Sequence, residues 1–125
     1  MAVTHSTAAK NAATDAVTAL IGASGFLTFR TTLGGTTVAT LPLSATAFAA
    51  SVGGTAAANG ITSDTNAAGS GTPVAFAALQ TSGNVIVINC AVTVSSGDIN
   101  MTNGLTVATG DTVSCSSLTY AALSA

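Results

Sequence analysis

Ionisable side chains are scarce in this sequence. Its 125 residues include no Glu, one His and only six charged side chains, against a usual charged share of about a quarter. General acid–base catalysis and metal binding both need several ionisable groups held close together. The sequence therefore predicts a protein that is not an enzyme and that uses no cofactor, metal or small-molecule substrate.

Positive charge and long hydrophobic runs are missing as well. The formal net charge of −2 supplies no basic field for a phosphate backbone, which excludes general nucleic-acid binding. Thr, Ser, Gly or Asn interrupts every hydrophobic stretch before it reaches the roughly 18 residues of a membrane span. The opening MAVTHS has no cationic region followed by an apolar block, so no secretory signal is expected. We expect a protein without a membrane partner that stays in the compartment where it is made.

Cysteine is limited to Cys90 and Cys115. Without a secretory signal, two reduced, core-type thiols are expected, and a disulfide is the alternative. What is abundant is Ala, Thr, Ser and Gly, which fill more than half of the positions. Val, Ile, Leu and Phe still exceed the rough 20% floor below which chains tend to remain disordered. The sequence therefore predicts a folded protein with one compact core.

One clear helical pattern covers residues 6–21. Apolar residues recur there with the spacing of a single helix face, at Ala9, Ala12, Ala13, Ala16, Val17, Leu20 and Ile21. The opposite side carries Lys10, Asn11, Thr14, Asp15 and Thr18. Ser6 or Thr7 can cap the first amides, and Gly22 can end the helix.

This helix has to pack against something, because an isolated helix of about fifteen residues is marginal in water. The Ala-rich stripe can pack on the protein's own sheet or on a neighbouring subunit, since small side chains permit close approach. The candidate subunit or capsid contacts are Ala9, Ala12, Ala13, Ala16, Val17, Leu20 and, from a predicted strand, Arg30.

After Gly25 the hydrophobic period changes from 3.6 to 2, which is typical of β-strands. Strands are expected at residues 26–32, 36–41, 74–81, 85–95, 99–101, 105–108 and 112–120. Turns are expected at Gly34-Gly35, Ser82-Gly83-Asn84, Gly97-Asp98, Asn103-Gly104 and Gly110-Asp111. The pattern predicts a mainly β protein, in which one N-terminal amphipathic α-helix precedes an antiparallel β-sandwich or jelly-roll-like domain. The helical arm would be residues 1–25 and the β-sandwich domain residues 26–125.

Three details refine this prediction. The longest strand places its apolar residues on one face, at Ile86, Ile88, Cys90, Val92 and Val94. In the last strand the parity changes between Cys115 and Leu118, so a bulge near Ser116-Ser117 is needed to keep both inside. Between residues 44 and 72 the signal is weak, and two short strands are expected, around Phe48 and at 56–61.

Single polar residues offer little chemistry. Asp98 and Asp111 each follow a Gly and are expected to bind backbone amides in their turns. Asp64 begins a stretch that resembles a calcium loop, but the acidic ligand at the twelfth position is missing, which favours a turn. His5 is expected to be an ordinary exposed side chain. Arg30 can pair with an Asp of its own domain or make a contact across a subunit boundary.

The surface that remains is nearly uncharged. Small net charge promotes association, and Thr and Ser suit broad contacts because they lose little rotamer freedom. The composition therefore favours a subunit of a closed, symmetric homo-oligomer.

Four stretches resemble a group of small virion proteins of tailed bacteriophages. They are residues 37–48 (TVATLPLSATAF), 59–67 (NGITSDTNA), 83–88 (GNVIVI) and 110–120 (GDTVSCSSLTY). The resemblance implies a capsid decoration, or cement, protein that binds the capsomer lattice as an oligomer, most often a trimer. The implied partner is the major capsid protein, and the implied location is the capsid surface of a virion assembled in the host cytoplasm.

Two other functions remain open at this point. One is a structural subunit of the tail, baseplate or fibre. The other is a host-attachment module that grips a surface glycan through the loops at 68–73 or 98–103.

Overall fold

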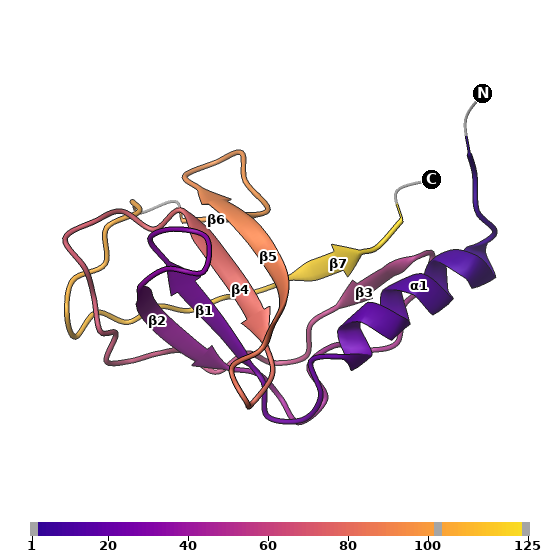
Figure 1. The fold of residues 1–125 in the computed structure, drawn as a ribbon, viewed down its shortest axis with the longest axis horizontal. Helices are drawn as coiled ribbons and strands as arrows, with labels where there is room; N and C mark the ends of the chain where they lie inside the picture. The colour runs from indigo at the N-terminus through magenta and orange to yellow at the C-terminus, as the bar shows by residue number, and fades with distance from the viewer. Residues whose placement is uncertain (1–2, 102–103, 124–125) are drawn as a thin grey trace.

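The computed structural model describes residues 3–101 and 104–123 of the chain (Figure 1). Helix α1, Thr7–Ala19, lies within the predicted span. Ser6 is its N-cap and accepts a hydrogen bond from the Ala9 amide at 3.2 Å, which satisfies one of the free N–H groups of the first turn. Gly22 follows with φ +71°, a left-handed conformation that Gly adopts at little cost. The predicted helix and its two end signals are confirmed.

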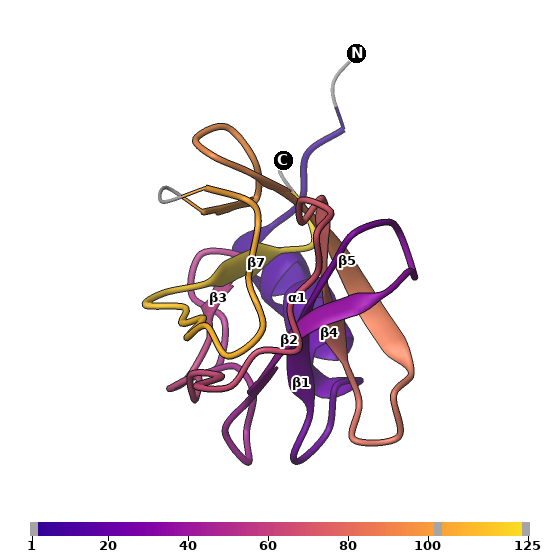
Figure 2. The same cartoon turned by 90° about the vertical axis from the view of Figure 1, so that its left-hand side faces the viewer.

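The body of the molecule is a five-stranded sheet with the strand order β2-β1-β4-β5-β6. Neighbouring strands are antiparallel, except that β6 runs parallel to β5. The strands are β1 (Phe26–Arg30), β2 (Thr37–Pro42), β4 (Phe76–Gln80), β5 (Ile86–Thr93) and β6 (Ile99–Asn100). The protein is therefore mainly β, with a curled mixed sheet and one short N-terminal helix (Figure 2).

A second, smaller sheet joins two strands that are far apart in the sequence. Strand β3, Thr55–Ala57, pairs antiparallel with β7, Thr119–Ala121. Helix α1 contacts both strands. Figure 1 shows α1, β3 and β7 together at one end of the molecule and the large sheet at the other. The N-terminal helix is therefore packed against the C-terminal strand.

The sequence locates the large sheet well and the C-terminal third poorly. Each of the five strands of the large sheet overlaps a predicted segment. In contrast, residues 105–108 form no strand, and of the predicted strand at 112–120 only the end is a strand in the structure. These residues pair instead through isolated contacts, such as the bridge between Asp64 and Val113 and the bond from the Ser70 amide to the Val107 carbonyl at 2.9 Å. The turn expected at Asn103-Gly104 lies partly outside the described residues.

The structure modifies two further expectations, one for residues 44–72 and one for the C-terminal strand. In the weak region, Phe48 forms an isolated bridge with Ala58, and β3 overlaps the other expected strand. Near the C-terminus, Val113 and Leu118 are both buried although their parities differ. The chain achieves this because the expected bulge is replaced by a full interruption between the Val113 bridge and β7.

The core lies on one face of the large sheet. Leu27 of β1 is opposite Leu41 of β2 and Leu79 of β4, and all three are fully buried. Each such side chain contributes about 2 kcal/mol to folding relative to an exposed one. The predicted apolar face of β5 is buried only at Cys90 and Val92, and Val94 is 46% exposed.

Residues 62–70 cover the outer edge of β2. The Thr62 amide binds the Pro42 carbonyl at 2.9 Å, and the Gly69 amide binds the Val38 carbonyl at 3.0 Å. Gly69 has φ +74°, and a Cβ there would collide with the Thr109 backbone. Only Gly allows this close approach, which brings residues 105–113 alongside 62–70 and across the core face of the sheet.

Candidate functional site

Helix α1 packs through its polar side, and Thr14 is the centre of that contact. Thr14 is fully buried. Its hydroxyl donates a hydrogen bond to the Gly54 carbonyl at 2.7 Å and accepts one from the Ala122 amide at 3.1 Å. One side chain therefore connects the helix to the loop before β3 and to the residue after β7, and it leaves both backbone groups satisfied.

Two neighbours on the same side extend this contact. The Gly54 amide donates to Asn11 Oδ1 at 2.8 Å, and the Ser51 amide donates to Asp15 Oδ1 at 2.9 Å. The Ser51 hydroxyl also donates to the Asn11 carbonyl at 3.1 Å. The helix thus holds the loop at residues 51–54 by hydrogen bonds rather than by apolar packing.

The Ala-rich stripe is consequently not the face that docks, which corrects the expectation that it packs on the protein's own sheet. Ala13 and Val17, at the margin of the stripe, are half-buried, and Ile21 is buried. The remaining members are exposed: Ala9, Ala12, Ala16 and Leu20. Leu20 is 66% exposed. The reason is that the buried backbone groups of residues 51–54 need polar partners, which only the other face of α1 supplies.

Arg30 lies at the end of β1 in a network of neutral groups. Its guanidinium donates to the Gly35 carbonyl at 2.7 Å, to Gln80 Oε1 at 2.9 Å and to Thr28 Oγ1 at 3.2 Å. Gln80 is buried, and its Nε2 donates to Asn84 Oδ1 at 3.0 Å. Within the described part of the chain, Arg30 therefore has neutral partners in place of the expected Asp, and its role at a subunit boundary stays a prediction.

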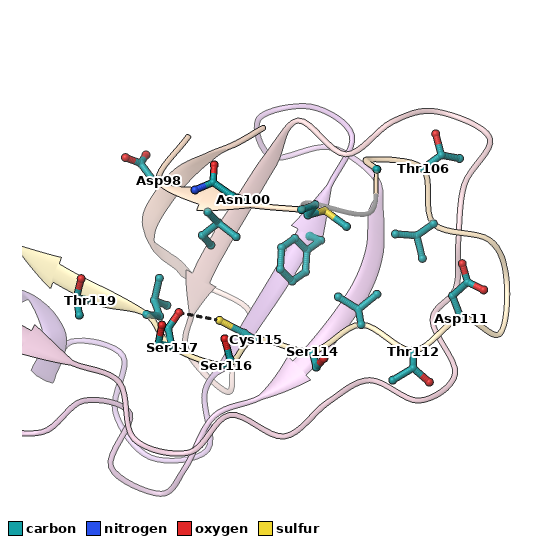
Figure 3. Close-up of a pocket in the computed structure, with 17 residues that line it drawn as sticks. Asp98, Asn100, Thr106, Asp111, Thr112, Ser114, Cys115, Ser116, Ser117 and Thr119 are labelled. Carbon is teal, nitrogen blue, oxygen red and sulfur yellow. Dashed lines mark hydrogen bonds between the residues drawn. The ribbon is translucent and has the colours of Figure 1, made fainter. Parts of the chain in front are cut away.

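A cavity of about 620 Å³ lies on the core side of the sheet (Figure 3). Phe29 of β1 lines it from the sheet. One side is formed by residues 98–101, which include β6, and the other by residues 111–119 of the C-terminal segment. The cavity thus separates an edge of the sheet from the segment that crosses its concave face.

On both sides of the cavity the chain is extended, and exposed residues alternate along it with more buried ones. On one side Ile99 and Met101 are half-buried and Asn100 is exposed, and on the other Val113 is buried between exposed neighbours. Figure 3 shows the side chains of Asp98, Thr106 and Thr112 at the rim, directed away from the space between them. The polar groups therefore do not converge on a common point as they would around a bound polar ligand.

Sequence reasoning named Asp98 and Cys115 but did not bring them to one place. They lie on opposite sides of this cavity because the chain folds back between them. The change of parity after Cys115 was the only signal that this segment is irregular. Of the two loops proposed to hold a glycan, the one at 98–103 contributes lining residues in its described part, and that function stays a prediction.

Both cysteines are free thiols. Burial, and to a smaller extent the negative charge of Asp98, raises the pKa of Cys90 to about 11. Burial also raises the pKa of Cys115, which half-faces solvent and lines the cavity, and a hydrogen bond with the Ser117 backbone offsets part of this rise. The thiolate is the reactive form, so neither thiol is activated as a nucleophile.

The carboxylates serve the fold. Asp64 accepts from the Thr40 amide at 2.9 Å and from the Asn66 amide at 3.0 Å. Asp98 accepts from the Ala91 amide, and Asp111 from the Ala108 amide. Backbone bonding within its own turn is confirmed for Asp111, whereas Asp98 binds an amide of β5 instead. Asp64 shapes the bend that follows it through the Asn66 amide and also forms a bridge with Val113.

Residues 3–101 and 104–123 contain no group of three or more His, Cys, Asp or Glu side chains that could hold a metal ion. Within the same residues, no helix has the length and hydrophobicity needed to cross a membrane.

Comparison with protein-family models, with curated proteins and with solved structures gives no match for this chain. A functional proposal therefore depends on the residues themselves and on the resemblance that they carry.

Proposed function

We propose that this protein is a non-enzymatic structural protein of a tailed-phage virion, which decorates the capsid and stabilises it by binding the capsomer lattice as an oligomer, a trimer in the simplest case. In that setting the major capsid protein is the partner, and the capsid surface is the location. The resemblance of residues 37–48, 59–67, 83–88 and 110–120 to small virion proteins motivates the proposal.

The observation that carries the oligomeric part is the exposed stripe on α1. Ala9, Ala12, Ala16 and Leu20 form an apolar strip that the packing of Thr14 turns towards solvent. Apolar area removed from water is worth about 25 cal/mol per Å². A neighbouring subunit that covers this strip would gain that energy, and the small side chains would let its backbone come close.

The charge distribution agrees with such a role. Like Asp15, the other three carboxylates accept hydrogen bonds from backbone amides. Arg30 binds neutral groups of its own chain. The surface therefore offers few ions that would have to be desolvated on assembly. We also propose that the sheet and the segments on its concave face form a sandwich-like or jelly-roll-like body in the particle.

The experiment compares Ala16→Glu with Ala8→Glu in the full-length protein. Ala16 lies in the exposed stripe, whereas Ala8 is also exposed but lies outside it. Light scattering after size-exclusion chromatography should give an oligomer, a trimer on our proposal, for the wild type and Ala8→Glu, and a monomer for Ala16→Glu. A monomeric wild type at high concentration would contradict the proposal.

Location is tested by imaging. Cryo-electron microscopy of particles that carry the protein should place it on the head with icosahedral symmetry. Density confined to the tail, baseplate or fibre would overturn the capsid assignment in favour of a tail subunit.

A further inference from the structure

Strand β5 has neighbours on both sides only at its end. It pairs with β4 along most of its length, whereas β6 pairs with it at Val92 and Thr93 alone. Among the described residues, none pairs with the outer edge of β5 between Ile86 and Asn89. Figure 2 shows β5 beyond β4 at the border of the large sheet. The large sheet therefore has an open edge along the first half of β5.

The hydrogen bonds of β5 show which backbone groups face this edge. The Val92 amide donates, at 3.0 Å, to the carbonyl of the residue before β4. The Ala91 amide points the other way and donates to Asp98 Oδ2 at 3.0 Å. Backbone groups of successive residues alternate between the two edges of a strand, so the N–H and C=O of Asn89 and Val87 also face away from β4. Within residues 3–101 and 104–123 no strand pairs with them on that side.

The sequence of this stretch leaves the edge unprotected. Edge strands commonly carry Lys, Pro or other charged residues that prevent pairing with another strand. Residues 85–89 read VIVIN, with no charged residue and no Pro, and are rich in β-branched residues that favour strands. A bulge at Val87, where the register with β4 shifts, twists the start of β5. Pairing is therefore expected over residues 87–89 rather than along the whole strand.

The core side of the edge is incomplete as well. Ile88 lies on the same face of the sheet as the buried Cys90, but Ile88 itself is only half-buried against the core. Ile86, on the same face, is also half-buried. Only another extended, uncharged chain supplies N–H and C=O groups at the spacing of a strand together with an apolar side chain that covers Ile88.

We infer that this edge pairs with the same edge of a second copy, antiparallel across a two-fold axis at Ile88. In that register Val87 of each copy is opposite Asn89 of the other, which gives about four backbone hydrogen bonds. The two Ile88 side chains meet and continue the apolar face from one sheet to the next. A second copy is the occupant because the edge is self-complementary, with a donor and an acceptor at each of the two residues and no charge that would repel its like.

This interface is separate from the exposed stripe on α1 and does not depend on the virion role. A few hydrogen bonds and one apolar pair make a contact far smaller than a standard protein interface. We therefore expect it at millimolar protein concentration and not in the dilute samples of size-exclusion chromatography. Copies that another contact holds close together would form it more readily, because their effective concentration is higher.

Hydrogen–deuterium exchange resolved to single amides tests the pairing in the full-length protein. The Val87 and Asn89 amides should exchange freely at micromolar concentration and at least about tenfold more slowly at millimolar concentration. The Cys90 amide is the internal reference, because it pairs with Ala77 of β4 and should be protected at both concentrations. Val87 and Asn89 amides that are unprotected at both concentrations would overturn the inference.

Asn89→Lys and Asn89→Thr form a matched pair of variants. Position 89 is exposed, and its side chain lies on the face opposite to Ile88. Asn89→Lys brings two positive charges together near the axis, so it should abolish the concentration-dependent protection of Val87. Asn89→Thr is uncharged and β-branched and should keep it. An unchanged Cys90 amide shows that the Lys variant folds, and protection of Val87 that survives in this variant would contradict the pairing.

Failure of this inference and failure of the proposed function give different results. An oligomer that Ala16→Glu disrupts, with unprotected Val87 and Asn89 amides, keeps the α1 interface and removes only the edge pairing. Concentration-dependent protection that persists in Ala16→Glu keeps the edge pairing, even where the protein does not bind phage heads.

Discussion

At the scale of single residues, the few ionisable groups serve internal structure. Asp15, Asp64 and Asp98 each accept a hydrogen bond from a backbone amide elsewhere in the chain, and Asp111 accepts one from the Ala108 amide of its own turn. Hydrogen bonds to charged groups contribute about 1.5–3 kcal/mol each. In a chain with so few strands in its C-terminal third, these bonds hold the loops that regular pairing leaves free.

Cys90 gives a pH-dependent prediction at this scale. Its thiol has a pKa of about 11 in the folded protein, against an ordinary value of 9.0. Above pH 9 the unfolded chain loses the proton more readily than the folded one, so the free energy of unfolding should fall as pH rises from about 9 to about 11. Urea unfolding across this range measures the effect.

The variant Cys90→Ala is the comparison for that measurement. It lacks the buried thiol, so its free energy of unfolding should decline less steeply over the same pH interval, although its absolute stability is lower because of the lost packing. Identical slopes for the two proteins would show that the Cys90 proton does not contribute.

At the scale of the elements, the orientation of α1 depends on one hydroxyl. Thr14→Val keeps the shape of the side chain but removes the bonds to the Gly54 carbonyl and the Ala122 amide. Leaving buried polar groups unsatisfied costs about 1–3 kcal/mol for each group. We expect Thr14→Val to lower the free energy of unfolding by at least the cost of one unsatisfied group, about 1–3 kcal/mol. Chemical denaturation measures this change.

Thr18→Val is the matched control on the same helix. The Thr18 hydroxyl donates only to the Asp15 carbonyl within α1, at 3.3 Å, so its loss should change stability by about 0.5 kcal/mol or less. Equal effects of the two substitutions would mean that the bonds of Thr14 to the loop before β3 and to the residue after β7 do not anchor the helix.

At the scale of the whole molecule, the scarcity of charge bears on the oligomer that we propose. The protein has six charged side chains and a net charge of −2, so an interface between copies should depend on apolar and hydroxyl contacts. Raising NaCl from about 0.05 M to about 1 M shortens the Debye length to about 3 Å. We expect the oligomer measured by light scattering to keep its mass across this range. Dissociation at high salt would identify an ionic interface instead.

The fold and the candidate site were predictable to different extents for a physical reason. Local signals suffice for α1, whose cap at Ser6 and end at Gly22 are set by neighbouring residues. They also suffice for the strands of the large sheet, where period-2 alternation is sustained. The pairing of residues 105–113 with 64–70 consists of isolated contacts between distant segments, so the period-2 pattern that predicted strands at 105–108 and 112–120 could not reveal it.

The sequence by itself determined that the protein is mainly β, that one helix precedes the strands and that few ions are available for chemistry. Only the tertiary structure decided which side of the helix faces inward. The apolar stripe predicted one answer, but the backbone groups of residues 51–54 required hydrogen-bond partners, and Thr14, Asn11 and Asp15 supplied them. Composition and period record how hydrophobic a face is, whereas the polar groups that must be satisfied on burial are known only once distant segments meet.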